Sequence, residues 1–567
     1  MKTYLRILIL VLSIGCSTFA TAATDDLLRT VALRGQPALG LANDARFQSF
    51  SSAPILNANG QTAFAASLQQ LGGSVTGAND TGIWSEGSGA LALVAREGSH
   101  APGTPAGTNF GSFSLITPSL NDAGQTAFPA LLALGVDVSS SNDRGNWSEL
   151  SGPLALVIRE GTPFVGEPAG AIFSSFQGPI RISENHVAFS ARLQQGPGGV
   201  TTANDSGIWR SNGSTLEVAA REGSSAPGTD AGIVFRDFDG TSFALGADGH
   251  VGFLGRLSTD FGGVTANNDT GIWTDGSGPL ALLAREGSQA PGTPPGVNFG
   301  GNGFGAPSIN AVGQAAFHAN LQIGGSVTGD NDSGIWAQNG NSLDLVAREG
   351  DQAPGTPAGA TFWTLLNPPA INIEGETVFV GSLRSGVGGV TSDNDTGIWV
   401  NRNGALELVA REGSPAPGTS PSSNFSSFST RGSDLPVINA FGRVAFSAIM
   451  QGPNFGRGIW AEDLAGMLRL IVRQGDMLEV APGDFRTVSS LSFRGEAVFE
   501  DSRRGSGFND LGQVAFHATF TDGSSGVFVS DVATIPEPAT LLLAALCALM
   551  GAAVMRQSSR SLDQRLS

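Results

Sequence analysis

The chain has 567 residues, of which 40% are apolar, including 33 Phe, so it can bury a large core and is not a disordered protein. Its 80 Gly and 29 Pro lie in clusters between short apolar runs, a pattern typical of all-β proteins. The formal net charge of −18 excludes the basic surface that nucleic acids and anionic lipids require of a partner.

Residues 1–23 are predicted to be a secretory signal peptide. Lys2 and Arg6 precede an apolar run over residues 7–14, and the small residues Ala20 and Ala22 form a cleavage-like site. Lipidation at Cys16 is an alternative, although the preceding LSIG fits a lipoprotein signal poorly.

The stretch INAVGQAAFHANL, residues 309–321, returns in near-copies along the chain, such as LNANGQTAFAASL and FNDLGQVAFHATF. A fixed period of this kind indicates a repeat architecture. The recurring Phe marks eight units at intervals of 61 to 70 residues, at Phe64, Phe128, Phe189, Phe253, Phe317, Phe379, Phe446 and Phe516.

Each unit contains four predicted strands. In the second unit they are residues 109–120, residues 125–132, the residues around Trp147 and residues 154–161. Asn at the first and Gly at the fourth position, as in Asn310 and Gly313, favour a tight turn between the first two strands, so the repeated stretch is interpreted as a hairpin rather than a binding motif. Pro129 conflicts with its strand and is predicted to lie at a bulge.

The units are offset relative to the ends of the chain. A fourth-strand sequence that ends in Arg34-Gly35 stands at the N-terminus without the other three strands of a unit. The eighth unit ends after its third strand and has no fourth strand of its own. A closed ring explains this offset, because the N-terminal strand completes the last unit. We therefore predict an all-β, eight-bladed β-propeller of four-stranded blades over residues 24–532, closed by an N-terminal strand. An open β-solenoid and paired β-sandwiches are the alternatives.

Residues 533–567 are predicted to be a second targeting segment. Pro536, Glu537 and Pro538 precede seventeen apolar residues, 539–555, long enough for a short transmembrane helix, and Arg556 and Arg560 follow. The two cysteines, Cys16 and Cys547, both fall in targeting segments, so no disulfide is expected in the body. Without these two segments the body of the protein, residues 24–532, keeps 26 basic and 47 acidic residues, a net charge of −21.

The C-terminal segment resembles the PEP-CTERM sorting signal of bacterial exported proteins. The resemblance implies processing by an exosortase-type enzyme near Pro536, Glu537 and Pro538, in bacteria that make exopolysaccharide. The repeats over residues 25–531 resemble those of bacterial tandem NxxGxxAF-repeat surface proteins. That resemblance implies a location at the cell surface or in the extracellular matrix, with no assigned activity.

The links between second and third strands, and between fourth and first strands, are long, and function on repeat scaffolds usually resides in such loops. Six second-to-third links contain Asn-Asp. Their carboxylates are candidate calcium ligands, and the alternative is an Asx-turn. These residues are Asp80, Asp143, Asp205, Asp269, Asp332 and Asp395.

No catalytic residue is predicted, and no cofactor other than calcium. The recurring Arg of the fourth strand and Trp of the third are interpreted as structural, each Arg bonding the same group in every unit, and Trp363 is an outlier in a first strand. The five His show no ligand spacing. We expect an exported protein with a binding or structural role and an exopolysaccharide partner, in contact with the membrane only through the C-terminal segment before processing. The alternative is an enzyme acting on a polysaccharide or lactone at the long loops.

Overall fold

The computed structural model describes residues 28–531 except 43, 52, 72, 114–115, 165–168, 261, 277, 366–367, 431–433 and 496–505. The predicted signal peptide and the predicted sorting segment, with Pro536, Glu537 and Pro538, lie outside the described residues. Within the described part of the chain, no helix combines the length and the hydropathy needed to cross a membrane.

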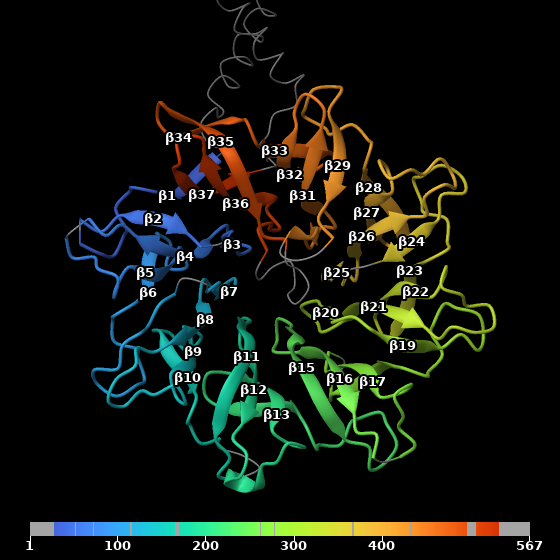
Figure 1. Cartoon of the computed structure of the whole chain (residues 1–567), viewed down its shortest axis with the longest axis horizontal. Helices are drawn as coiled ribbons and strands as arrows, with labels where there is room; N and C mark the ends of the chain where they lie inside the picture. Colours follow the sequence, from blue (N-terminus) through green and yellow to red (C-terminus); the bar gives the residue numbers. More distant parts are fainter. Residues whose placement is uncertain are drawn as a thin grey trace, which may run out of the picture.

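Eight antiparallel sheets follow one another around a ring, as the propeller prediction required (Figure 1). Blade 1 comprises β2–β6, blade 2 β7–β10, blade 3 β11–β14, blade 4 β15–β18, blade 5 β19–β23, blade 6 β24–β28, blade 7 β29–β33, and blade 8 β34–β37 with β1. The sheet order within a blade is first, second, third, fourth strand.

The first strand is continuous in three blades and has a short separate second part in most others. Its pieces are β2 (Phe47–Phe50), β3 (Ile55–Leu56), β7 (Ser119–Leu120), β11 (Phe173–Ile182), β15 (Phe235–Leu245), β19 (Phe299–Phe304), β20 (Ser308–Ile309), β24 (Phe362–Leu365), β25 (Ala370–Ile371), β29 (Asn424–Phe428), β30 (Val437–Ile438) and β35 (Asp484–Phe493).

The second strands carry the recurring Phe. They are β4 (Thr62–Leu68), β8 (Thr126–Leu131), β12 (Val187–Leu193), β16 (Val251–Leu257), β21 (Ala315–Leu321), β26 (Thr377–Leu383), β31 (Val444–Gln451) and β36 (Gln513–Phe520). The third strands are β5 (Thr81–Ser85), β9 (Arg144–Ser148), β13 (Ser206–Ser211), β17 (Thr270–Thr274), β22 (Ser333–Asn339), β27 (Thr396–Arg402), β32 (Gly456–Glu462) and β37 (Ser525–Asp531).

The fourth strands end in the recurring Arg in seven blades. They are β6 (Ala92–Arg96), β10 (Ala155–Arg159), β14 (Leu216–Arg221), β18 (Ala281–Arg285), β23 (Ser342–Arg348), β28 (Ala405–Arg411), β33 (Leu468–Arg473) and, in blade 8, β1 (Leu28–Leu33). Blade 8 has an additional strand, β34 (Met477–Ala481), paired with β35. One short 3-10 helix, η1 (Pro197–Gly199), lies in the second-to-third link of blade 3.

The ring closes through β1, which pairs antiparallel with β37. Leu28 lies opposite Ser530 and Leu33 opposite Gly526. The N-terminal strand therefore completes the last blade, which confirms the predicted closure and shows that the open solenoid and the paired sandwiches were wrong.

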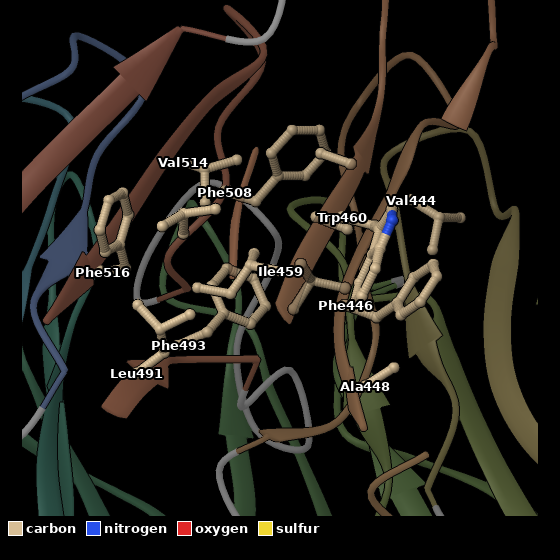
Figure 2. Packing of buried hydrophobic residues seen from close by; sticks show 14 of the residues in the cluster. Val444, Phe446, Ala448, Ile459, Trp460, Leu491, Phe493, Phe508, Val514 and Phe516 are labelled. Atoms are coloured by element: carbon tan, nitrogen blue, oxygen red, sulfur yellow. The ribbon is translucent and has the colours of Figure 1, made fainter. Parts of the chain in front are cut away.

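The core is built from the same aromatic pair in seven blades. All seven third-strand Trp residues are fully buried. In each of these blades a first-strand Phe meets the Trp edge-on, with ring centroids 4.9–5.2 Å apart. Figure 2 shows Phe446 beside Trp460 in blade 7, while Ile459, the next residue along β32, points toward Phe493 of blade 8. The prediction that these Trp residues belong to the core is confirmed.

The turns between first and second strands surround the centre of the ring (Figure 1), and their Asn residues do more than shape the turn. Asn57 Nδ2 donates to the carbonyl of Asn121 in the next blade at 3.0 Å. Asn509 Nδ2 in blade 8 donates to the carbonyl of Asn57, also at 3.0 Å, and so links the last blade to the first. Gly313 has a φ of +76° and lies against Gly276, where a Cβ would approach the Gly276 Cα to 2.3 Å. The hairpin prediction is confirmed, and the Asn residues also bind neighbouring blades together.

The irregularity predicted at Pro129 lies on one side of its strand only. Pro129 lies opposite Asn146 in unbroken register between β8 and β9. On its other side, Ala127 lies opposite Ser119 and Leu132 lies opposite Phe110, so the register shifts between these two contacts, where Pro129 lies. A proline fits there because no ladder bond on that side requires its missing N–H.

Candidate functional site

The long links lie together at one end of the strands, as predicted, and Figure 1 places them around the outer rim of the ring. The end of the fourth strand, where the fourth-to-first link begins, contacts the second-to-third link of the same blade. Arg96, at the end of β6, donates from Nε to the carbonyl of Asn79 in the second-to-third link of the same blade, at 2.8 Å.

This Arg contact recurs in six blades, which confirms the predicted common partner there, whereas Arg473 of blade 7 pairs with Asp476 instead. The guanidinium hydrogen bond joins the end of the fourth strand to the second-to-third link of the same blade. The pairs are Arg96 with Asn79, Arg159 with Asn142, Arg221 with Asn204, Arg285 with Asn268, Arg348 with Asn331 and Arg411 with Asn394.

The Asn of each Asn-Asp pair folds its own link. In blade 5 the Asn331 Oδ1 accepts from the backbone N–H of Thr328 at 2.8 Å, which is Asx-type turn chemistry. The carbonyl of the following Asp332 accepts from the backbone N–H of Leu321 at 2.6 Å, which joins the link to the end of the second strand. The same two bonds occur in the other five links.

The six predicted calcium ligands remain one to a blade. Asp205 pairs with Arg192 at 2.9 Å and Asp269 with Arg236 at 3.3 Å. Asp80 accepts from Gln70, and Asp395 from Thr396 Oγ1 at 3.2 Å. Among the residues that the structure describes, no three His, Cys, Asp or Glu side chains come together as a metal-binding group. Asp143 is the sixth of the set and occupies the same turn.

The sequence interpretation missed a second acidic residue beside these links, the Glu that follows the recurring Arg. Its carboxyl group accepts from the backbone N–H of the residue after the Asp, from Ser206 to Glu222 at 2.9 Å and from Thr396 to Glu412 at 3.2 Å. Burial raises the pKa of Glu222, Glu349 and Glu412 to about 7 and that of Glu160 to about 6. The nearby Asp raises the pKa of each further, because two neighbouring carboxyl groups disfavour the charge on each other.

The signal for these Glu residues was present in the repeated Arg-Glu-Gly of the fourth strand. One Asp and one Glu in each link offer fewer oxygen ligands than the six to eight that calcium requires. In blade 4 the burial of Glu286 leaves one of its oxygens without a hydrogen bond among the described residues. Glu286 is 2% exposed, and this oxygen is Oε2.

Blade 6 departs from the other blades at Trp363. This residue lies at a register shift in β24, between Phe362 and Thr364, and is 40% exposed. Arg384, at the start of the next long link, places its Cζ 5.1 Å from the centre of the indole ring. An ion pair of 2.9 Å joins Arg384 to Asp330 of blade 5.

A charged cluster at the opposite end of the strands has a structural explanation. Arg210 binds Asp275 at 2.7 Å and the carbonyl of Gly249 at 3.0 Å, and His250 lies 3.5 Å from Asp275. Arg402 makes the same pair of contacts, to Glu462 and to the carbonyl of Gly442. These contacts join neighbouring blades and do not isolate a catalytic pair.

Two His residues of the second strands lie in the interior. Burial lowers the pKa of both His318 and His517 to about 4, so they stay neutral around pH 7. The Nε2 of His517 has no partner among the described residues, and its ring lies 5.9 Å from Phe50 of blade 1.

The comparisons with known proteins identify a family. A family model described as a family of unknown function, DUF7453, matches residues 16–164, 117–262 and 259–542. No curated protein matches the chain in sequence.

Among solved structures, a protein of unknown function from Dyadobacter fermentans is similar at 11% identity and a TM-score of 0.25, covering 67% of this chain and 99% of its own. An acylaminoacyl peptidase from Pyrococcus horikoshii has 9% identity and a TM-score of 0.34, with 83% of this chain and 57% of the peptidase covered. An ancestral GH74 enzyme has 11% identity and a TM-score of 0.32, with 84% and 63% covered. The chain thus spans less than two thirds of both enzymes, and these likenesses carry no argument about function.

Proposed function

The chain belongs to the DUF7453 family, whose function is unknown, and we propose that it is an exported protein of the cell surface or extracellular matrix that binds exopolysaccharide. Exosortase processing near Pro536, Glu537 and Pro538 is part of this proposal. It rests on the resemblance of the C-terminal segment to a sorting signal.

The observation that carries the proposal is the equivalence of the long links around the rim. Six blades repeat the same Asn turn and the same hydrogen bond from the Arg guanidinium to the Asn carbonyl. A polymer of repeating units can engage several equivalent sites at once, and each further contact then benefits from a high effective concentration.

The tips of these links also present apolar side chains at comparable positions. Before or within the glycine-rich part of the link, five blades expose an aliphatic or aromatic residue by 40–77%, and blade 2 also exposes Val136. The five residues are Leu71, Leu134, Ile323, Val387 and Phe455. Repeated exposed apolar side chains on a polar rim are the composition expected of a contact surface.

Co-sedimentation of residues 24–534 with purified exopolysaccharide from the host, in calcium and in EDTA, tests the proposal. Binding in calcium that is lost in EDTA supports it and assigns the ligands to the Asp80-type links. Binding in both buffers supports the matrix role without calcium. The absence of binding in both buffers overturns it, and release of reducing ends during the incubation would favour an enzyme instead.

A further inference from the structure

Trp363 is the extra residue of a β-bulge that recurs in the first strands of several blades. The register between first and second strands shifts directly after the first-strand Phe, or after Val488 in blade 8, and the extra residue projects from the sheet. The residues at this position in the other bulged blades are small or polar: Gln48, Ser174, Arg236, Ser426 and Ser489.

The other seven Trp residues have structural roles that Trp363 lacks. All seven are fully buried, and six donate from Nε1 to a carbonyl of the fourth-to-first link that precedes their blade, at 2.9–3.1 Å. Trp363 lies outside this layer and is 40% exposed. An exposed indole at a bulge contributes little to the core, so its role is at the surface.

Two charged groups lie beside this indole, one of them over its ring. Arg384 lies over the ring, and its side chain is still 43% exposed. Asp330, which holds Arg384 by the 2.9 Å ion pair, is 51% exposed. Both groups keep hydrogen-bonding capacity toward solvent, since a guanidinium has five N–H donors and a carboxylate has about four acceptor positions.

We propose that Trp363, Arg384 and Asp330 form a subsite for a neutral pyranose unit of a polysaccharide, at the junction of blades 5 and 6. The apolar C–H face of a pyranose matches an exposed indole. Its hydroxyl groups can accept from Arg384 and donate to Asp330. The subsite rests on the proposed exopolysaccharide binding and gives that function one defined contact.

A neutral sugar fits better than an acidic one for electrostatic reasons. The Arg384–Asp330 pair carries no net charge, so no free cation is left for a uronate. The predicted body carries a net charge of −21, which repels polyanions at low ionic strength.

Trp fluorescence tests this subsite, because Trp363 is the one Trp of the eight that is exposed. Residues 24–534 are titrated with cellopentaose, laminaripentaose and mannopentaose, and with an oligogalacturonate as the anionic comparison. We expect a saturable change in emission with at least one neutral oligosaccharide. Trp363→Ala should abolish binding measured by calorimetry, and Arg384→Ala should weaken Kd about tenfold. Phe441→Ala, an exposed aromatic with Arg443 over its ring in the first-to-second turn of blade 7, should leave Kd unchanged.

The outcomes separate the subsite from the wider function. Unchanged emission with all three neutral oligosaccharides, or equal binding by the Trp363→Ala variant, overturns the subsite even if the polysaccharide still co-sediments with the protein. Binding of a pentaose through Trp363 without co-sedimentation supports the subsite and overturns exopolysaccharide as the partner. Stronger binding of the oligogalacturonate overturns the assignment to neutral sugars.

Discussion

At the residue scale, the least expected feature is the set of Glu residues buried beside Asp in the rim. Glu222, Glu349 and Glu412 are only 5–7% exposed, and burial is the main cause that raises the pKa of each to about 7. The repeated Arg-Glu was visible in the sequence, but neighbouring residues on a strand face opposite sides. The Glu therefore could not pair with its Arg, and only the folding of the long link shows that its neighbour is an Asp.

These carboxyl groups predict a pH dependence of stability. Because the folded pKa lies above the ordinary value of 4.5, the folded state holds the proton more tightly than the unfolded state. Their contribution is therefore complete below about pH 4.5 and is lost as the pH rises through 7. The triple variant Glu222→Gln, Glu349→Gln, Glu412→Gln should gain stability relative to the wild type between pH 5 and pH 8, by roughly 1–3 kcal/mol per residue.

Urea unfolding at pH 5, 6, 7 and 8 measures this difference. The buried His residues titrate in both proteins, so their contribution cancels in the comparison. Glu374→Gln, at an exposed turn position, is the matched control and should follow the wild type. A difference between the triple variant and the wild type that does not change with pH would contradict the prediction.

At the element scale, the third strand of blade 2 carries a buried polar residue where the others carry an aliphatic one. The residue before the recurring aromatic residue is Ile in six blades and Val527 in blade 8, but Asn146 in β9. Asn146 is 1% exposed, and neither Oδ1 nor Nδ2 has a hydrogen-bond partner among the described residues. A buried amide without partners costs its full desolvation free energy.

Asn146→Ile, which restores the side chain of the other blades, should therefore stabilise the protein by about 1–3 kcal/mol. The free energy of unfolding from urea titration measures the gain. The reverse change in blade 1, Ile83→Asn, should destabilise the protein by a comparable or larger amount, since Ile83 is fully buried. A loss of stability in Asn146→Ile would mean that the amide has a partner, such as a bound water.

The elements themselves could largely be predicted from the sequence, because their signals are local. Alternating apolar residues mark the strands, and Asn and Gly at the first and fourth positions mark the central turns. The proline in β8 indicated an irregularity, but the sequence did not show on which side of the strand it lies. The structure places it on the first-strand side, between the contacts at Ala127 and Leu132, and keeps regular pairing with β9.

At the scale of the whole molecule, stability depends on closure by β1. Ala32 and Leu33 are buried, and the pairing of β1 covers the edge of β37. Removing residues 24–33 should lower the free energy of unfolding by about 3–5 kcal/mol, because it exposes apolar surface and an unpaired strand edge.

Urea unfolding and size-exclusion chromatography of residues 34–534 check this prediction, and self-association through the free edge is expected. A synthetic peptide of residues 26–36 should restore monomeric behaviour, whereas a scrambled peptide of the same composition should not. A truncated protein as stable as the intact chain would show that β1 is not needed for closure.

The sequence by itself determined the number of blades, the four strands in each and the closure of the ring. These follow from local periodicity and from counting which strands lack a repeat at each end. Only the tertiary structure decided which side chains meet across blades. The Asn57–Asn121 bond spans 64 residues, and Arg384 reaches Asp330 from the next blade. Such contacts depend on how the sheets pack around the ring, and packing between distant segments leaves no periodic mark in the chain.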